Sequence, residues 1–341
     1  KELRSIGIQT NIILCRTDRP IAADAKDKIA LFCNVPEKNV IEALDQSNIY
    51  KAPLAYHQEG FDREVLQHFD LLSSSPKPNL SLWLNISKQL DDFTDKVRIA
   101  IISKYNKLQD AYKSLVEAFV HAGIYHSLKV ELIWIDAEKV ESVGVEELLQ
   151  NIQGVVIPGG FGKRGIGGKM DVIKYARIND IPCFGICLGM QLMVVEYSRN
   201  VLAIKNARSS EFDEVIDHSN NVHYVIDRIV DSDDLGGTMR LGSYLCELTT
   251  KSKIAEIYNK NIISERHRHR FGFNLKYKSY FDQSGMLFSG YEKGSKMIEA
   301  VEIPQHPWFI GVQFHPEFQS RPFHAHPLFS SFIKVSHENR K

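Results

Sequence analysis

The sequence lacks the features that would point to a membrane or to nucleic acid as its partner. No apolar run approaches the roughly 18 residues that a membrane-spanning helix needs. Basic and acidic residues both number 42, so no net charge draws the chain to a polyanion or a lipid surface. Internal repeats and low-complexity tracts are also absent from the sequence. We therefore expect neither nucleic acid nor a membrane as a partner.

Cysteine is scarce, and its spacing excludes two common uses. The chain forms no CxxC pair and no disulfide ladder from its five cysteines, Cys15, Cys33, Cys183, Cys187 and Cys246. An odd count that includes one candidate nucleophile suits the reducing cytosol, so we expect a cytoplasmic protein. At 341 residues the chain has room for about two domains and a sizeable core.

One cysteine is placed where a nucleophile is expected. Cys187 stands between Gly185 and Gly189, after an apolar run at 181–186 that predicts a strand and before a stretch at 188–198 that predicts a helix. A nucleophile between two small residues at a strand-to-helix turn is the cysteine form of the nucleophile elbow. The helix N-terminus favours the thiolate over the thiol. The alternative for this pattern alone is a buried structural cysteine.

A histidine and a glutamate near the C-terminus supply the partners of this cysteine. The run 309–314 predicts a strand that leads directly into His315, Pro316 and Glu317. A cysteine nucleophile needs a base, and the imidazole needs a third group that orients it. Pro316 favours an extended residue before it, which lets the two side chains point the same way. We predict a Cys187–His315–Glu317 triad, against the alternative of a surface histidine beside a solvated glutamate.

A glycine-rich turn can hold the oxyanion of acyl transfer. The apolar run 154–158 predicts a strand that ends in Gly159, Gly160, Phe161 and a further glycine. The chemistry needs backbone N–H groups aimed at the developing negative oxygen. We expect them from Gly159 and from Leu188, the residue after the nucleophile. A phosphate cradle is the alternative, although the turn lacks the Gly-Lys-Ser/Thr ending of a P-loop.

Alternating strands and helices from residue 96 onward predict an α/β fold. Repeated strand–helix units form a mainly parallel sheet with helices on both faces, and ligands gather at the carboxyl ends of its strands. Shorter pieces within 220–300 predict an antiparallel extension. Further strands are expected at 97–102 and 129–135, and helices at 110–120 (stopped by Gly123), 145–151 and 169–179.

These motifs together resemble a known family. The segments Pro158–Gly162, Gly185–Gln191 and His315–Glu317 resemble the class I glutamine amidotransferase domain. Other segments, spread over nearly the whole chain, are similar to the CTP synthase family: Lys1–Ile8, Cys15–Pro20, Lys28–Asn34, Asp234–Gly242 and Glu265–Arg270.

The resemblance implies a division of the chain. Residues 1–72 are expected to be a partial α/β segment, the C-terminal part of a synthase (amidoligase) domain. Residues 73–95 would be a linker and crossing helix, and residues 96–341 a class I glutamine amidotransferase domain. A P-loop and most of a magnesium site would precede residue 1, so we expect this chain alone to hydrolyse glutamine only.

The family's reaction supplies the expected ligands. The intact enzyme would use ATP and Mg²⁺ to convert UTP to CTP with ammonia from L-glutamine, with CTP as feedback ligand and a homotetramer as its assembly. The amidotransferase domain itself would need no cofactor and no metal. Arg16, Lys28 and Asp45 match positions near the nucleotides in this family.

The same resemblance implies the contacts with glutamine. Arg270 would hold the α-carboxylate and Glu211 the ammonium, with Gly160, Phe161 and Gln191 as further contacts. From the residues alone, the run 265–270 could also be a nucleic-acid patch or a metal site. Alternation puts its two histidines on one face and its arginines on the other, and no cysteine or helically spaced histidine pair supports a metal.

Two departures from the family pattern and two rival functions remain. Gly167 and Gly272 stand where the family has acidic residues, which puts in doubt the ordering of the lid and the coupling between domains. The first rival is another Cys-His-Glu hydrolase of the same fold, such as a γ-glutamyl peptidase. The second is a non-catalytic assembly module.

Overall fold

The chain forms two compact units. The computed structural model describes residues 2–104, 109–213, 216, 222–229, 239–282 and 284–339. One unit spans Lys1–Asp92 and the other Phe93–Lys341, so the division falls inside the segment 73–95 that the sequence predicts as a linker. Of the motif Asp234–Gly242, residues 234–238 lie outside the described residues. None of the described helices is long and apolar enough to cross a lipid bilayer.

The first unit is a small α/β element. Strand β1 (Ile13–Thr17) pairs in parallel with β2 (Val40–Leu44), and helix α2 (Ala23–Cys33) connects them. The helix ends where Asn34 adopts a left-handed φ of 55°. Four helices complete the unit: α1 (Glu2–Ser5), α3 (Ala52–Gln58), α4 (Phe61–His68) and α5 (Ser81–Asp91).

The second unit is built on a nine-stranded sheet within the described residues. The strand order is β10-β9-β12-β13-β14-β6-β5-β3-β4, in which β14 to β4 are parallel and β10 to β14 pair antiparallel. The α/β class and the antiparallel extension are confirmed. The bounds are β3 (Lys96–Ser103), β4 (Lys129–Asp136), β5 (Gly154–Ile157), β6 (Cys183–Ile186), β9 (Arg240–Leu248), β10 (Ile262–His269), β12 (Leu287–Glu292), β13 (Ile298–Glu302) and β14 (Phe309–Val312).

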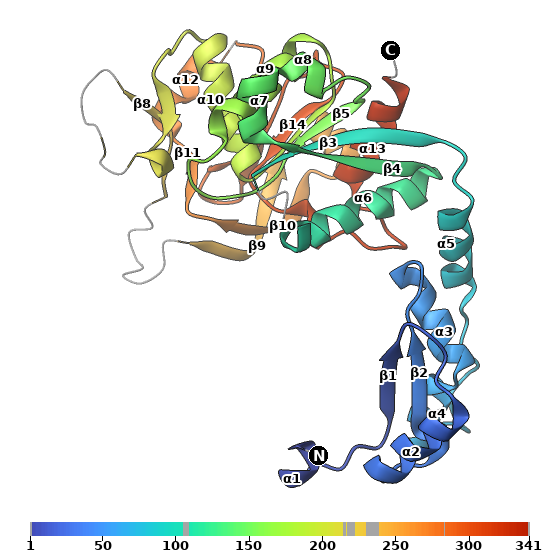
Figure 1. Ribbon diagram of the computed structural model, residues 1–341. Helices are drawn as coiled ribbons and strands as arrows, with labels where there is room; N and C mark the ends of the chain where they lie inside the picture. Colours follow the sequence, from blue (N-terminus) through green and yellow to red (C-terminus); the bar gives the residue numbers. More distant parts are fainter. Residues whose placement is uncertain are drawn as a thin grey trace. The chain divides into compact units, whose positions relative to one another are not determined.

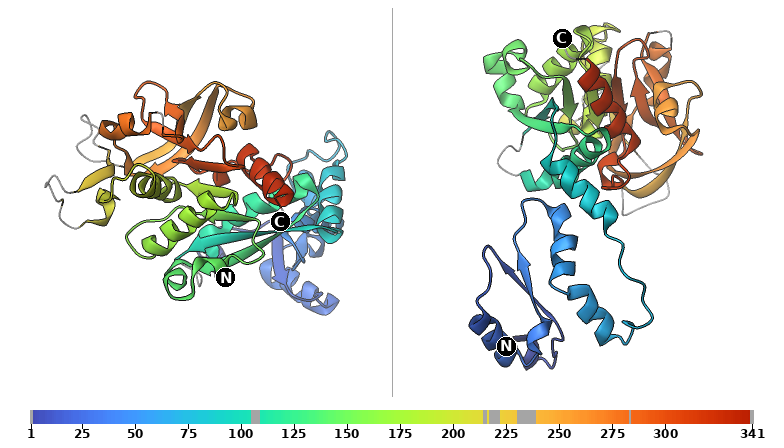
Figure 2. Two further views of the ribbon diagram at one scale, coloured as in Figure 1. Left: turned by 90° about the horizontal axis from the view of Figure 1, so that it is seen from above. Right: turned by 90° about the vertical axis from the view of Figure 1, so that its right-hand side faces the viewer.

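Helices cover both faces of the sheet (Figure 1). Helices α6 (Lys113–His126) and α13 (Pro327–Glu338) pack side by side on one face, as Figure 2 also shows, and α9 (Ile166–Ile178) and α10 (Leu188–Asn200) pack together on the other. Both faces need a cover because alternate side chains of a strand point to opposite sides of the sheet, as strand β3 shows. Ile99 and Ile101 join the α6–α13 core, whereas Ala100 and Ile102 join the α9–α10 core. Other helices are α7 (Ala137–Val143), α8 (Val145–Leu148), α11 (Lys253–Tyr258) and α12 (Lys278–Phe281).

A second, three-stranded sheet lies beside α10. Its order is β11 (Phe271–Phe273), β8 (His223–Arg228) and β7 (Ala207–Ser209). The short turn η4 (Ser210–Phe212) follows β7 and carries Glu211. This sheet is continuous in sequence with β10, because β11 begins two residues after that strand ends.

Two predicted helix boundaries are wrong. Helix α6 does not stop at Gly123 but continues to His126, where Ser127 takes the left-handed φ of 55°. Gly123 is buried within the helix, and the position has no room for a side chain because a Cβ there would lie 2.6 Å from the carbonyl oxygen of Leu128. The predicted helix 145–151 is a shorter one, α8, preceded by α7 and separated from it by Gly144 with φ 99°.

Candidate active site

Cys187 occupies a sharp turn between β6 and α10. Its own backbone takes the left-handed φ of 53°, whereas neither neighbouring glycine has a positive φ. The glycines are needed for close approach instead. A Cβ on Gly189 would overlap the carbonyl oxygen of Ile157 in β5, and one on Gly185 would overlap the sulfur of Met193. Because β6, β5 and α10 pack closely at both glycines, the sharp turn of the backbone, with its positive φ, falls on Cys187.

His315 comes from the neighbouring strand. Strands β6 and β14 are parallel, with Ile186 opposite Val312, and the Cys187 N–H donates to the Val312 carbonyl at 2.7 Å. His315 follows three residues later, and its N–H donates to the Arg266 carbonyl at 2.8 Å. The sheet ladder thus brings cysteine and histidine to one edge, although 128 positions separate them in the chain.

The imidazole of His315 is held between a carboxylate and the thiol. Its Nδ1–H donates to Glu317 Oε1 at 2.7 Å, and both side chains are largely buried, at 12% and 11% exposed. Burial acts to lower the pKa of His315. Hydrogen bonds and charge interactions with Cys187 and Glu317 outweigh it and raise that pKa to about 10. The raised pKa favours the imidazolium form of this histidine, next to the cysteine, at neutral pH.

A cavity of about 220 Å³ opens over these side chains. Gly159 lies against the triad, since a Cβ there would stand 2.9 Å from His315 Cε1 and 3.6 Å from Cys187 Cβ. Leu188 begins α10, so its N–H is one of the first-turn groups that have no acceptor within the helix. The cavity is lined by residues that include Gly159, Gly160, Phe161, Cys187, Arg268, His315 and Glu317.

Three residues that the resemblance links to glutamine lie outside this lining. Gln191 is buried, and its Nε2 donates to the Phe271 carbonyl at 3.0 Å and to Gln313 Oε1 at 3.2 Å. Glu211 accepts from the Gly162 N–H at 2.8 Å; burial raises its pKa, and that N–H together with Lys104 opposes the rise.

Arg270, the third, is exposed at the end of β10, and its carbonyl accepts from Ile229 N–H at 2.9 Å. Arg268 lines the cavity instead. Sequence alternation places these two arginines on the same face of the strand, so it could have identified both as candidate site residues. Gln313 was missed because no local pattern marks it; its Nε2 lies 3.6 Å from Cys187 Sγ.

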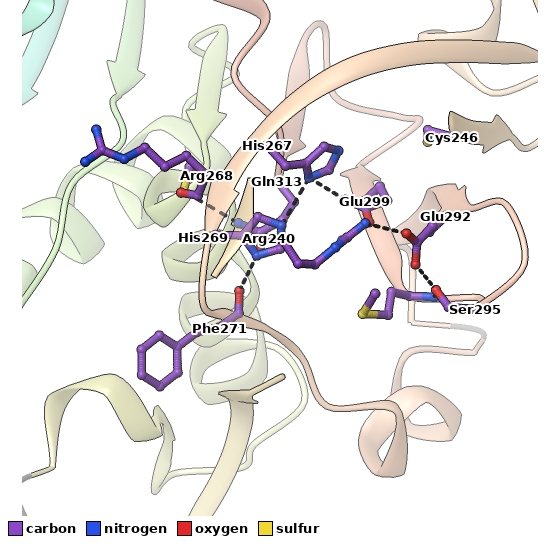
Figure 3. Close-up of polar contacts among 12 residues, drawn as sticks. Arg240, Cys246, His267, Arg268, His269, Phe271, Glu292, Ser295, Glu299 and Gln313 are labelled. Carbon is purple, nitrogen blue, oxygen red and sulfur yellow. Dashed lines mark hydrogen bonds and ion pairs between the residues drawn. The ribbon is translucent and has the colours of Figure 1, made fainter. Parts of the chain in front are cut away.

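The histidines of β10 belong to a buried polar cluster that includes Arg240 and Glu299 (Figure 3). The strand alternates as predicted, with His267 and His269 inside and the arginines outside. Ligand-type atoms of His267, His269 and Glu299 lie within 4.8 Å of one another, a contact that the sequence does not suggest. Arg240 donates to Glu299 Oε1 at 2.6 Å, and this fixed positive charge disfavours a cation there.

The two departures from the family pattern have different surroundings. At Gly167, a Cβ would overlap Oε1 of Glu141, so a carboxylate from α7 already lies at this position. At Gly272, a Cβ would lie 3.1 Å from Cδ1 of Ile229. An acidic group is thus present at the first place, whereas the second has an apolar neighbour.

The candidate nucleotide residues are exposed in the first unit. Arg16 lies in β1, one residue before its carboxyl end, Asp45 follows β2, and Arg16 Nε lies 3.0 Å from Asp45 Oδ1. Lys28 pairs with Asp24 one helical turn away, at 3.3 Å. The structure thus joins the first two residues by an ion pair and places the third on the surface of α2.

Comparison with known proteins agrees with this geometry. Residues 107–335 match the family model of class I glutamine amidotransferases, and residues 1–71 match that of the CTP synthase N-terminus. CTP synthase from Pelagibacter ubique (strain HTCC1062) is 51% identical over 345 residues that include 100% of this chain. This chain belongs to the CTP synthase family. CTP synthase from Hydrogenobaculum sp. (strain Y04AAS1) is 49% identical over 341 residues, again covering 100% of the chain.

A solved structure of the CTP synthase family matches the second unit. The glutaminase domain of Trypanosoma brucei CTPS with bound acivicin has a TM-score of 0.65 and 36% identity, and covers 71% of this chain and 94% of its own. This likeness confirms the amidotransferase fold. The chain spans 64% and 62% of the length of the two curated CTP synthases.

Proposed function

We propose that this chain hydrolyses L-glutamine and, as part of a CTP synthase, delivers the ammonia to UTP. The observation that carries the hydrolase half is the cavity in which Cys187, on a strained turn, meets an imidazolium paired with Glu317 at 2.7 Å. A nucleophile, a base and an orienting acid at one cavity suffice for acyl transfer.

The reaction has two halves. The thiolate of Cys187 attacks the carboxamide carbon of glutamine, and the negative oxygen is held by the N–H groups of Gly159 and Leu188. His315 gives its proton to the leaving nitrogen, which departs as ammonia and leaves a thioester. Water then loses a proton to His315 and attacks the thioester, which releases glutamate and restores the thiolate. Glu317 keeps the imidazole oriented throughout.

Two charged side chains would select free glutamine. We assign the α-carboxylate to Arg270 and the ammonium to Glu211, with Gly160, Phe161 and Gln191 around the side chain. The support is the family membership together with the position of Gly160 and Phe161 on the cavity wall. A planar guanidinium suits a carboxylate because it can donate two parallel hydrogen bonds.

The synthase half rests on the family. The intact enzyme would phosphorylate UTP with ATP, accept the ammonia and form CTP, with Mg²⁺ entering on the ATP phosphates. Arg16, Lys28 and Asp45 are exposed polar groups whose charges suit phosphate and a hydrated cation. CTP as feedback ligand and a homotetramer are part of the same proposal. All five cysteines are free, as a reactive thiol in a reducing cytosol requires.

A glutaminase assay tests the hydrolase half. Cys187→Ala should abolish ammonia release from glutamine, whereas Cys33→Ala, a matched control in the first unit, should leave it unchanged. Glutamine hydrolysis retained by Cys187→Ala would remove this residue from the role, and a wild-type chain without hydrolysis would favour the non-catalytic module.

Complementation tests the synthase half. With the upstream part of one of the related CTP synthases supplied, the wild-type chain should form CTP from UTP, ATP and glutamine. Cys187→Ala should lose CTP formation with glutamine and regain it with ammonium chloride, because only the ammonia source is missing. Hydrolysis without CTP formation under these conditions would favour a different hydrolase of this fold.

A further inference from the structure

Gln313 is a buried residue whose side-chain amide reaches the sulfur of Cys187. It is the first residue after β14 and is only 1% exposed. Its Nε2 is 3.6 Å from Cys187 Sγ, within reach of an N–H···S hydrogen bond. This sulfur also has a polar contact with the main chain, the Arg268 carbonyl at 3.8 Å, which can only accept from a protonated thiol.

The direction of the Gln313 amide is fixed by a chain of hydrogen bonds. The Phe271 carbonyl can only accept, so Gln191 must turn its NH₂ group towards it, at 3.0 Å. The same NH₂ group is 3.2 Å from the oxygen of Gln313. A reversed Gln313 would set two NH₂ groups against each other. Its oxygen therefore faces Gln191, and its NH₂ group faces the sulfur.

Buried histidines anchor the far end of this chain (Figure 3). His269 Nδ1–H also donates to the Phe271 carbonyl, at 2.9 Å, so its Nε2 must accept from His267 Nδ1–H at 3.1 Å. Burial lowers the pKa of both histidines far below the usual value, which keeps them neutral. Beyond them, Glu299 is held by Arg240 at 2.6 Å. This chain of bonds is closed to solvent and cannot easily reverse.

We propose that Gln313 is a further residue of the nucleophile's site, a fixed N–H donor that stabilises the thiolate of Cys187. Gln191 is then a positioning residue that acts through Gln313. An N–H donor stabilises the charged sulfur more than the neutral thiol, so it increases the thiolate fraction. The other charged or titratable groups at the sulfur are His315, backed by Glu317, and Arg268 on the cavity wall. The inference rests on the proposed role of Cys187 as nucleophile.

Alkylation of Cys187 by iodoacetamide tests this inference without glutamine. The rate should be measured between pH 5 and 9, with the modified cysteine identified by peptide mass spectrometry. Gln313→Met removes the donor and should move the midpoint of the rate profile up by about one pH unit, a roughly tenfold loss of rate on its acid side. The alkaline plateau should be unchanged, because the thiolate there is complete in both proteins.

Two further variants separate this role from a structural one. Gln313→Glu keeps the shape but presents a second oxygen, so its midpoint should lie above that of Gln313→Met. Gln191→Met frees the amide and should give a smaller shift in the same direction. Gln319→Met, the same change on the neighbouring turn, should give none, since Gln319 donates to Ser264 and Glu265 instead.

Unchanged midpoints in folded Gln313→Met and Gln313→Glu would overturn the inference, as would a loss of the plateau alone. If Gln313→Met shifts the midpoint relative to the wild type, but the wild-type chain fails to hydrolyse glutamine, this role of Gln313 is upheld and the proposed function is rejected. Should Gln313→Met not fold, Gln313→Glu and Gln191→Met carry the same test, and an unmoved midpoint in both rejects the inference.

Discussion

Arg270 is the residue on which resemblance and geometry differ most, since Arg268 is the arginine that lines the cavity. We expect Arg270→Ala to raise the KM for glutamine by about ten- to a hundredfold. A charge-assisted hydrogen bond contributes about 1.5–3 kcal/mol, and each 1.4 kcal/mol is a factor of ten. Turnover should fall less, because the carboxylate is bound equally in ground and transition states. Steady-state kinetics on glutamine measure both quantities.

Arg266 provides the matched control for that measurement. It is exposed on the same face of β10, and only its backbone carbonyl, which the substitution keeps, bonds to His315. Arg266→Ala should leave the KM unchanged. A nucleic-acid patch predicts the opposite outcome, in which each arginine variant weakens salt-sensitive retention on heparin and none alters glutamine kinetics.

Single residues were predictable from the sequence when a local pattern marks them. Cys187 stands between two glycines at a strand end, and His315 follows a strand and precedes a proline, so each has a signal within a few positions. Gln313 has none. It is one polar residue in an apolar run, and its contact with the sulfur spans 126 positions. Only the pairing of β6 with β14 brings the two together.

At the scale of an element, Gly189 decides whether α10 can pack against β5. Gly189→Ala would set a methyl group onto the carbonyl oxygen of Ile157, so either the helix or the strand must move. We expect a loss of about 2 kcal/mol or more in the free energy of unfolding, as for other overpacked sites. Urea unfolding measures the loss. Gly160→Ala, whose Cβ would meet only Leu188 at 3.6 Å, should change the free energy by less than about 1 kcal/mol; equal losses in both variants would contradict the argument.

Elements were predicted well where periodicity and apolar runs are long. The buried strands of the parallel half and helix α10 lie close to their predicted ranges. Boundaries failed where packing overrides local preference. Gly123 reads as a helix end, yet the helix continues because the missing side chain admits the Leu128 carbonyl. Leu128 lies in the turn just after the helix, and its N–H donates to the Gly123 carbonyl at 2.9 Å, so the glycine accommodates the turn that ends the helix three residues later.

For the whole molecule, buried neutral histidines predict acid lability. Burial lowers the pKa of His121 to about 4, and the pKa values of His267 and His269 lie lower still. The unfolded chain takes up protons at these residues below pH 6.5, and the native protein does not. The contribution of these three histidines to stability is therefore full above pH 6.5 and falls as the pH falls, by about 1.4 kcal/mol per pH unit for each histidine. His315, whose pKa is raised, adds no slope in this range because it is protonated in both states.

Urea unfolding at pH 7, 5.5 and 4.5 measures this dependence. Between pH 5.5 and 4.5 the three histidines together should remove about 4 kcal/mol from the free energy of unfolding. His121→Asn removes one of these proton acceptors and should reduce the slope. A free energy that stays constant from pH 7 to 4.5 would contradict the neutral state of these histidines.

Strand β14 joins the two halves of the sheet, with β13 antiparallel on one side and β6 parallel on the other. It follows the other eight described strands of this sheet in the chain, yet it is the fifth of the nine in the strand order. Pairing of β14 with β6 is a long-range contact, which forms slowly and exposes unpaired strand edges until it is made. During synthesis, Cys187 is added to the chain 128 positions before His315. Pairing of β14 with β6 therefore joins the two halves of the sheet and brings Cys187 and His315 together in one event, so a chain that stops before β14 lacks the second of these residues.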